Sequence, residues 1–261
     1  MIRMAVGGIG IRAPGIDHWE SILQNPEYTI PIAPAPGQPK GIGQGLPGTE
    51  RRRATAVTRL ALDLAMEAAG NMDTRRLSAV FCSSGGEVTV VHQIFSMLAE
   101  GDNALSPTAF HNSVHNAAQG YWSIASGSTQ PADSICAFDD SFGAGLAECC
   151  LRYADDQRNL LLVTYDIPPP FPISSHRRIH NAMGGALLLA ADNVVPKAFI
   201  TVRYESGIGS KQSTSKDIQD STEHPGSGLI RLIMAIARKQ TTEVAVRAGF
   251  GGTLHVLVEP C

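Results

Sequence analysis

The sequence predicts a layered α/β fold. Short apolar runs of strand length alternate with segments whose apolar residues recur at helical spacing, and this alternation is typical of sheets covered by helices. A chain of 261 residues, 43% hydrophobic and 17% charged, can bury one substantial core or two closely packed halves. The composition argues against widespread disorder.

The N-terminal region predicts one strand, one short helix and a long loop. Met4 to Ile11 forms an apolar strand, and Asp17 to Leu23 forms a helix in which Trp19 and Ile22 face inward. Asn25 to Gly48 is rich in Pro and Gly and predicts an ordered loop. Its GIGQGLPG string is typical of a phosphate-binding turn, but no strand precedes it, so an ordinary loop is favoured.

The next helix, Ala54 to Ala69, has a core-facing stripe and a charged side that we expect to be solvated. The stripe consists of Val57, Leu60, Ala61, Leu64, Ala65 and Ala68, and the charged side of Arg59, Asp63 and Glu67. We expect the basic run from Arg51 to Arg53 at the helix start, and Gly70 at its end.

A strand, a Gly-rich turn and a helix follow at Leu77 to Cys82, Ser83 to Gly86 and Glu87 to Ala99. Later strands are expected at Leu160 to Tyr165, Ala186 to Ala191, Phe199 to Glu205, Val244 to Ala248 and Leu254 to Val258, with a helix at Leu229 to Ala237. Pro168 to Pro172 predicts an extended stretch after a strand end. Gly207 to Ser227 is polar and predicts a surface loop without function.

Charge and cysteine usage narrow the class of protein. The net charge is −3, and no run of Lys or Arg extends beyond Arg51 to Arg53, which argues against a nucleic-acid-binding surface. No 18-residue apolar stretch and no signal-peptide pattern occur, so we expect a cytoplasmic protein without a membrane span. Five cysteines, with Cys149 and Cys150 adjacent, predict reduced thiols and no zinc site.

The segment from Ser134 to Glu148, SICAFDDSFGAGLAE, is the most informative one for function. A short apolar run enters a tight turn and then a small-residue helix from Gly143 onward, an arrangement that lifts a reactive side chain onto a helix N-terminus. In this chain the lifted position lacks an obvious nucleophile.

Four strings in order resemble the β-ketoacyl synthases of the thiolase superfamily. They are LSPTAFHNSVHNAAQGYWSIASG from Leu105, with Ser106 and Pro107 at its start and Asn116, Gly120 and Ile124 in an N-x-x-x-G-x-x-x-I pattern, the SICAFDD turn, GGALLLA from Gly184, and GFGGT from Gly249 to Thr253. The resemblance implies a thiolase-like layered αβαβα fold with a truncated second half. It divides the chain into residues 1–193, the synthase N-terminal-like half, and 194–261, a shortened C-terminal half that ends in the GFGGT loop.

The resemblance also implies that the nucleophile is missing. Aligning Gly145 and Ala147 with the synthase helix places Ala137 where those enzymes carry the active cysteine, whereas a shift of one residue would restore Cys136. Phe138, Asp139 and Asp140 follow in place of small residues, and two carboxylates beside a thiol disfavour the thiolate. Phe138, Asp139 and Phe250 are expected near this degenerate site.

Chain length leads to the same expectation. Catalytic synthases need two histidines, or an equivalent pair, to stabilise the oxyanion and assist decarboxylation. Only about 40 residues separate Glu205 from Gly249, and His224 is the sole histidine between them. It matches neither histidine motif of the family.

Within the superfamily, the chain is most similar to the chain length factors, including those of aryl polyene biosynthesis. This implies a non-catalytic subunit that pairs with a catalytic ketosynthase and shapes or stabilises its acyl tunnel, with no cofactor or metal. The expected interface and tunnel residues are Ser106, Pro107, Phe110, His111, His115, Asn116, Gly120, Tyr121 and Trp122. Phe110 or Tyr121 would limit chain growth sterically. Two alternatives stay open, an acyl-thioester condensing enzyme or hydrolase that uses Cys136, and a homodimeric scaffold.

Other constellations favour structural roles. His111 and His115 are spaced to share a helix face as in metal sites, but no third ligand accompanies them, so polar contacts at a subunit interface are favoured. Asp139 and Asp140 are expected to point apart, one of them capping the next helix.

A serine mechanism from Ser141 with His176 or His180 lacks a nucleophile elbow. The basic loop from His176 to His180 could meet an acidic carrier protein or its phosphopantetheine arm, although a plain solvated loop is favoured.

Overall fold

The computed structural model describes residues 1–102, 104–190, 194–207, 224–249 and 251–261. One eight-stranded sheet runs through it in the order β3-β2-β4-β5-β1-β6-β8-β7. The strands are β1 (Ile2–Arg12), β2 (Ser78–Cys82), β3 (Ala132–Ile135), β4 (Leu160–Asp166), β5 (Met183–Ala190), β6 (Ala198–Glu205), β7 (Thr242–Arg247) and β8 (Thr253–Pro260). β2 pairs in parallel with β3 and β4, and the pairings from β4 through β7 are antiparallel.

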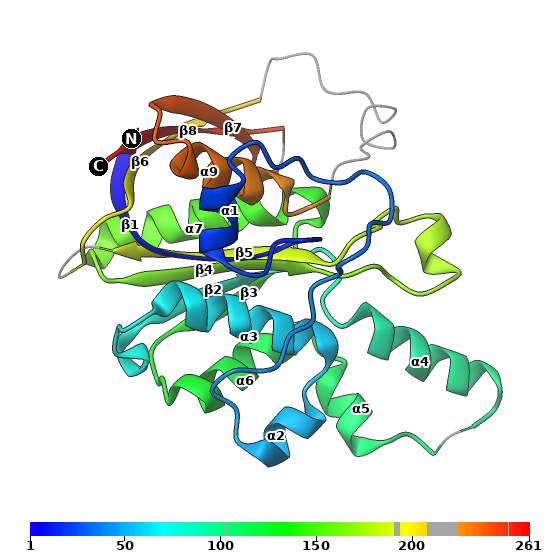
Figure 1. Ribbon diagram of the computed structural model, residues 1–261. Helices are drawn as coiled ribbons and strands as arrows, with labels where there is room; N and C mark the ends of the chain where they lie inside the picture. Colours follow the sequence, from blue (N-terminus) through cyan, green and yellow to red (C-terminus); the bar gives the residue numbers. More distant parts are fainter. Residues whose placement is uncertain (103, 191–193, 208–223, 250) are drawn as a thin grey trace.

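Strand β1 joins the two parts of the sheet. Residues 5–12 pair with β5 and residues 2–6 pair with β6, with an irregularity between Val6 and Gly8. Figure 1 shows β1 curving from the layer of β4 and β5 toward the layer of β6, β8 and β7. The hydrogen-bonded sheet is therefore continuous across the expected domain boundary, and residue 193 itself lies outside the described residues.

Some helices lie between these two parts of the sheet, and others cover the outer face of the part that contains β2 to β5. The helices are α1 (Trp19–Gln24), α2 (Gly48–Arg53), α3 (Ala56–Ala69), α4 (Val88–Ala99), α5 (Pro107–Asn112), α6 (Ala117–Ser126), α7 (Ser141–Asp156) and α9 (Ser227–Ala237). Short 3₁₀ turns occur at Thr74–Arg76, Phe138–Asp140 and Ile173–Ser175. In Figure 1, α7 and α9 lie between the two parts of the sheet, while on the opposite face α3 covers β4 and β5 and α6 packs against β2 and β3. The predicted layered α/β fold is confirmed.

Strand β4 begins with a continuous apolar run because helices pack on both of its faces. Leu160 and Leu162 pack into the core that contains α7 and α9. Leu161 and Val163 point to the other face and pack against α3 and α6. A strand covered by helices on both faces has no side for polar residues, which is the pattern of LLLVTY.

Helix α3 differs from its prediction on the charged side. Asp63 is buried, and its carboxylate accepts the backbone N–H groups of Ile42 and Gln44, while Glu67 pairs with Arg12. The expected solvated face is therefore covered, at Asp63 by the loop of residues 25–47 and at Glu67 by Arg12 and the Trp19 N–H. Since the amides of the GIGQGLPG string bind this carboxylate, they are not available to a phosphate.

The basic run from Arg51 to Arg53 also differs from its prediction. Arg51, Arg52 and Arg53 form the last turn of α2, where cations interact favourably with the helix dipole, and not the start of a helix. All five cysteines are free. No helix among the described residues is long and apolar enough to cross a membrane.

Candidate functional site at the N-terminus of α7

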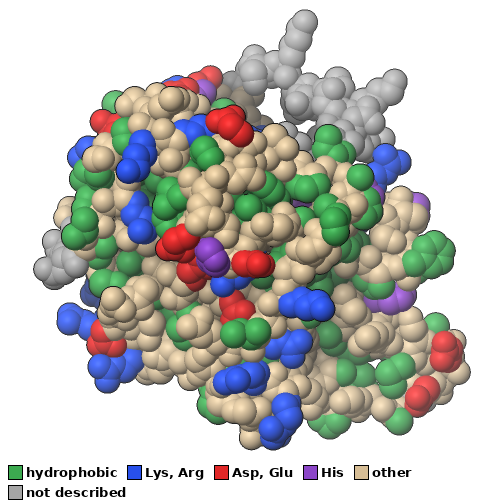
Figure 2. Space-filling view, viewed as in Figure 1, with side chains coloured by type: hydrophobic (Ala, Val, Ile, Leu, Met, Phe, Trp, Pro, Cys, Tyr) green, Lys and Arg blue, Asp and Glu red, His purple; other side chains and the backbone are tan. Residues whose placement is uncertain are grey.

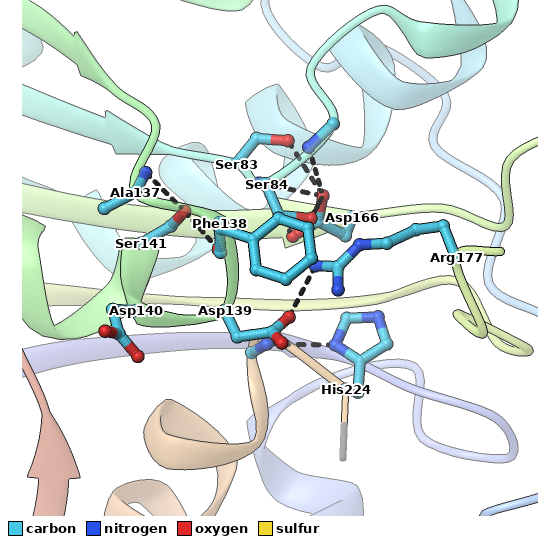
Figure 3. Close-up of polar contacts among 12 residues, drawn as sticks. Ser83, Ser84, Ala137, Phe138, Asp139, Asp140, Ser141, Asp166, Arg177 and His224 are labelled. Atoms are coloured by element: carbon cyan, nitrogen blue, oxygen red, sulfur yellow. Dashed lines mark hydrogen bonds and ion pairs between the residues drawn. The ribbon is translucent and has the colours of Figure 1, made fainter. Parts of the chain in front are cut away.

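The turn between β3 and α7 is closed by a serine. β3 is the edge strand beside β2, and the chain leaves it through the 3₁₀ turn Phe138–Asp140. The Ser141 hydroxyl accepts the N–H of Ala137 and donates to the carbonyl of Phe138 (Figure 3). Phe138 has φ +53°, a left-handed conformation that costs a non-glycine residue about 1 kcal/mol. Ser141 thus holds a strained turn in place.

Gly143, in the first turn of α7, lets the end of β7 approach. A Cβ atom at this position would lie 1.9 Å from the carbonyl oxygen of Arg247, so no other residue fits without movement of the backbone. The small-residue character of the predicted helix therefore reflects close packing between α7 and the second part of the sheet. This contact brings Arg247 within reach of the turn.

The two aspartates of the turn have different arginine partners. Asp139 Oδ1 lies 2.6 Å from Arg177 Nη2, and Asp140 Oδ1 lies 2.7 Å from Arg247 Nη2. The side chains point apart, as expected (Figure 3). The expectation that one of them caps α7 is wrong, because the N-cap residue Asp140 makes no side-chain cap bond. Both carboxylates are instead used for ion pairs.

Asp139 and Arg177 form the buried part of this arrangement. The Asp139 side chain is 6% exposed and the Arg177 side chain 20% exposed, and their contact is an ion pair without hydrogen-bond geometry. The Arg177 guanidinium also stacks over the Phe138 ring, with Cζ 3.9 Å from the ring centroid. A carboxylate at this helix N-terminus is also favoured by the helix dipole. Arg177, which follows the proline-rich stretch, therefore holds the turn through both Asp139 and Phe138.

The basic loop of residues 176–180 is thus only partly solvated. His176, Arg178 and His180 are exposed, as a solvated loop requires, but Arg177 turns inward to Asp139. The prediction of a plain solvated loop is wrong for Arg177. The sequence alone does not indicate which of these four basic residues pairs with a carboxylate that is distant in the chain.

His224 is the histidine that the structure brings to this site. It is buried and lies beside Asp139 in Figure 3. Its Nδ1 accepts the N–H of Gly226 at 3.0 Å, so the ring proton is assigned to Nε2, which has no hydrogen-bond partner among the described residues. Burial lowers the pKa of His224 to about 4. The ring is neutral at neutral pH.

The Cys136 thiol lies on the other side of the turn. Its Sγ donates to the carbonyl oxygen of Ser84 at 3.4 Å, and the residue is exposed. Ser84 belongs to the turn after β2, where its N–H and hydroxyl, together with the Ser83 hydroxyl and the Gly85 N–H, bind the carboxylate of Asp166. Burial of Asp166 raises its pKa. Whether Ala137 or Cys136 is the position equivalent to the synthase cysteine stays a prediction.

The space at the centre of the site is small. Asp139, Gly143, His224, Gly228 and Arg247 contribute to the walls of a cavity of about 40 Å³, and Cys136 is not among the residues that line it. This volume holds one or two water molecules and no acyl chain. Phe250, expected near the site, lies outside the described residues.

The expected interface residues divide into exposed and buried ones. Phe110 is 63% exposed, but Tyr121 and Trp122 are fully buried in the core beneath α6, so the interpretation of these two as interface anchors is wrong. The sequence signal was ambiguous because α6 has apolar residues on both faces. Asn116 precedes α6, and open space surrounds the Cα of Gly120.

The remaining residues of this segment make local contacts. Ser106 caps α5 through its hydroxyl, with Pro107 as the first helical residue. His111 packs edge-on against Tyr121, whereas His115 lies beyond the end of α5 and its Nε2 binds the carbonyl of Ser83. The two histidines therefore do not share one helix face. The described residues contain no cluster of three potential metal ligands.

Residues 19–248 match the family described as "Beta-ketoacyl synthase, N-terminal domain". No curated protein matches.

Solved structures of ketosynthases and chain length factors share the fold. A chain of the ketosynthase ApeO in complex with its chain length factor ApeC from Xenorhabdus doucetiae is 21% identical, with a TM-score of 0.70, and 98% of this chain aligns with 100% of that one. The ishigamide ketosynthase/chain length factor is 10% identical with a TM-score of 0.74 and covers 100% and 99% of the two chains.

The complex AntDE:AntF, a type II polyketide synthase acyl carrier protein with its ketosynthase, is 10% identical with a TM-score of 0.75, at the same coverage of 100% and 99%. These likenesses confirm the predicted thiolase-like fold, and the match over residues 19–248 shows that the chain belongs to the β-ketoacyl synthase family.

Proposed function

We propose that this chain is a non-catalytic subunit of the chain-length-factor type, which pairs with a catalytic β-ketoacyl synthase in fatty acid or polyketide-type biosynthesis, including that of aryl polyenes. The observation that carries the proposal is the ion pair between Asp139 and Arg177 at the N-terminus of α7. This is the turn in which a thiolase-type enzyme is expected to present its nucleophile. Here a carboxylate and a guanidinium occupy it.

The chemistry of the turn supports a non-catalytic role. An attacking thiolate must approach an acyl carbonyl, and the resulting oxyanion needs preorganised donors aimed at open space. Arg177 already contacts the Asp139 carboxylate, and the cavity of about 40 Å³ next to His224 has no room for a thioester. A single neutral histidine also falls short of the pair that the resemblance implies for catalysis.

An exposed apolar arm supports pairing with a partner. Helices α4 and α5 pack against each other and project from the body of the protein in Figure 1. Val90 is the only buried residue of α4 although the helix is largely apolar, and Phe95 is 65% exposed. Figure 2 shows hydrophobic side chains at the surface of this arm, at the lower right. Apolar surface of this kind is typical of protein–protein interfaces.

An open sheet edge offers a second contact for a partner. β3 is the last strand on its side of the sheet, and its four residues are half-buried or exposed, so its outer backbone groups can pair with another chain. Phe110 and Ile124 add exposed apolar side chains from α5 and α6. A partner of related fold that covers α4, α5, α6 and β3 would bury all of these groups.

Two finer assignments belong to the same proposal. Phe110 is the candidate for a side chain that enters the acyl tunnel of the partner and limits chain growth, because it is both aromatic and exposed. The exposed side chains of Arg178 and His180 are candidates for contact with an acidic acyl carrier protein.

Co-purification with a catalytic ketosynthase tests the pairing. The chain and the tagged ketosynthase are produced together, and the 1:1 complex is quantified for Phe95→Asp and Phe110→Asp. Each buried carboxylate should lower the complex yield at least about tenfold. Val195→Asp, at a position 88% exposed and outside the arm, is the matched control and should leave the yield unchanged. Recovery of the wild-type chain as a monomer beside an uncomplexed synthase contradicts the proposal.

A further inference from the structure

A groove of about 910 Å³ adjoins the small cavity at Asp139, and the two share His224 in their walls. Its walls are the segment of residues 28–32, helix α9, the start of β7 and residues 178–181. Figure 1 shows the segment after α1 running beside α9. Cavities of about 300 to 1,000 Å³ are the usual size of small-molecule sites.

The floor of the groove is apolar. Ile230 and Met234, one helical turn apart on α9, share it with Ala235 and with Val244 of β7. Ile30 lines the groove from the opposite wall. An extended hydrocarbon chain laid along this floor would gain roughly 25 cal/mol for each Å² of apolar surface removed from water.

The rim carries an excess of positive charge. Arg178, Arg231 and Arg238 line the groove together with His180, and Glu243 is the one acidic side chain among the described lining residues. Arg238 already pairs with Glu27, with Nη2 3.5 Å from Oε2, and Arg231 also has a partner of its own, so Arg178 is the cation on which the inference rests. Glu243 Oε1 also contacts His255 Nδ1 at 3.0 Å, so this carboxylate already has a polar partner outside the groove. Arg178 makes no ion pair with any residue that the structure describes. The rim is therefore complementary to an anionic group.

One end of the groove reaches a buried donor. His224 lines the groove as well as the small cavity, is 8% exposed, and its Nε2–H has no hydrogen-bond partner within the described parts of the chain. An unpartnered donor of this kind costs about 1 to 3 kcal/mol when buried. A polar atom of a bound molecule could remove that cost.

We infer that this groove binds an amphiphile that combines an anionic head group with an apolar tail. The tail lies along Ile230 and Met234, and the head group lies at the rim beside Arg178 and His180. The site is formed by this chain alone and does not depend on a ketosynthase partner. A binding test on the purified chain is therefore independent of the proposed pairing.

Calorimetric titration with three twelve-carbon probes tests the inference. Dodecanoate and dodecyl phosphate supply the two common anionic head groups, and dodecanol supplies the same tail without charge. We expect at least one anionic probe to bind with a Kd below about 100 µM, and dodecanol at least about tenfold more weakly. The stronger of the two anions identifies the head group as carboxylate or phosphate.

Two variants locate the site. Arg178→Gln removes the rim cation and should weaken the anionic probe about three- to tenfold while leaving dodecanol unchanged. Thr242→Trp places a large side chain at an exposed position in the groove and should abolish binding of the anion, whereas Thr241→Trp, at the neighbouring exposed position that does not line the groove, should not. Circular dichroism confirms that each variant is folded.

Three results overturn the inference. They are the absence of saturable binding of either anion, equal affinity for dodecanol and the anions, and binding that survives Thr242→Trp unchanged.

Discussion

Arg177 and Asp139 come from loops that lie 38 positions apart in the sequence, and they meet at 2.6 Å over the N-terminus of α7. The pair occupies the turn that the family resemblance assigns to a nucleophile, and Phe138 lies beneath the guanidinium. The ion pair stabilises the turn, so we expect the free energy of unfolding to depend on the charges of Asp139 and Arg177.

Removing Arg177 should destabilise the protein. Arg177→Met leaves the Asp139 carboxylate buried without its cation, and we expect the free energy of unfolding to fall by about 1 to 3 kcal/mol. Arg247→Met is the matched control, because its pair with Asp140 is half-exposed and should contribute less than about 1 kcal/mol. Urea denaturation at neutral pH measures both.

The double variant Arg177→Met/Asp139→Asn should recover part of this loss, because no unpaired charge remains in it. Equal stabilities of the wild type, Arg177→Met and the double variant would show that the ion pair does not stabilise the turn.

His224 predicts a specific pH dependence. Its folded-state pKa is about 4, below the ordinary value of 6.5, so the unfolded chain binds a proton between these values while the folded chain does not. The wild type should therefore lose stability as the pH falls from 6.5 toward 4, by roughly 3 kcal/mol from this residue. His224→Gln should lack this contribution.

The measurement is the difference in unfolding free energy between the wild type and His224→Gln across this pH range. Burial raises the pKa values of Glu87 and Asp166, which contribute with the opposite sign, but both residues are present in both proteins and cancel in the difference. A constant difference between pH 4 and 7 would mean that His224 is solvated.

Cys136 should not become acylated. Its thiol binds the Ser84 carbonyl and does not line the cavity next to His224, so this histidine is not placed to act as its base. Incubation with an acyl carrier thioester or a cysteine-directed inhibitor, followed by intact-mass analysis, should show no stoichiometric adduct. Cys136→Ala is the control, and a wild-type adduct that this variant loses would favour the condensing enzyme or hydrolase.

Phe110 should influence product length in the complex. Overfilling or emptying a packed tunnel changes energies by roughly 1 to 3 kcal/mol, which corresponds to about 5- to 150-fold in the partition between elongation and release. Phe110→Ala should lengthen the products and Phe110→Trp should shorten them, as measured by mass spectrometry of the released acyl chains. A change in complex yield with unchanged lengths would instead indicate a scaffold.

The sequence predicted the elements that show a clear apolar pattern, either a continuous run in a strand or a stripe at helical spacing. Strand β4 is buried at every position and begins with four apolar residues because helices cover both of its faces, and the apolar stripe of α3 is buried as expected. β3 was not bounded as a strand, because its residues ADSI are half polar and its pairing with β2 is what makes it one.

The sequence did not predict contacts between residues that are distant in the chain, because no local pattern identifies their partners. Asp63 has the spacing of a surface residue and is buried only because a distant loop donates its amides to it. Arg177 and His224 belong to polar segments that suggested surface loops, and their partners lie on other elements. Trp122 shows the converse, an aromatic side chain whose burial depends on which face of α6 meets α3.

The most direct test of the central claim is the stoichiometry of acylation in the reconstituted pair. The chain and a catalytic ketosynthase are mixed, treated with an acyl carrier thioester, and analysed by native and peptide mass spectrometry. We expect a 1:1 heterodimer that carries one acyl group, located on the cysteine of the ketosynthase. A second acyl group on Cys136 of this chain, or the persistence of two separate proteins, would contradict the account.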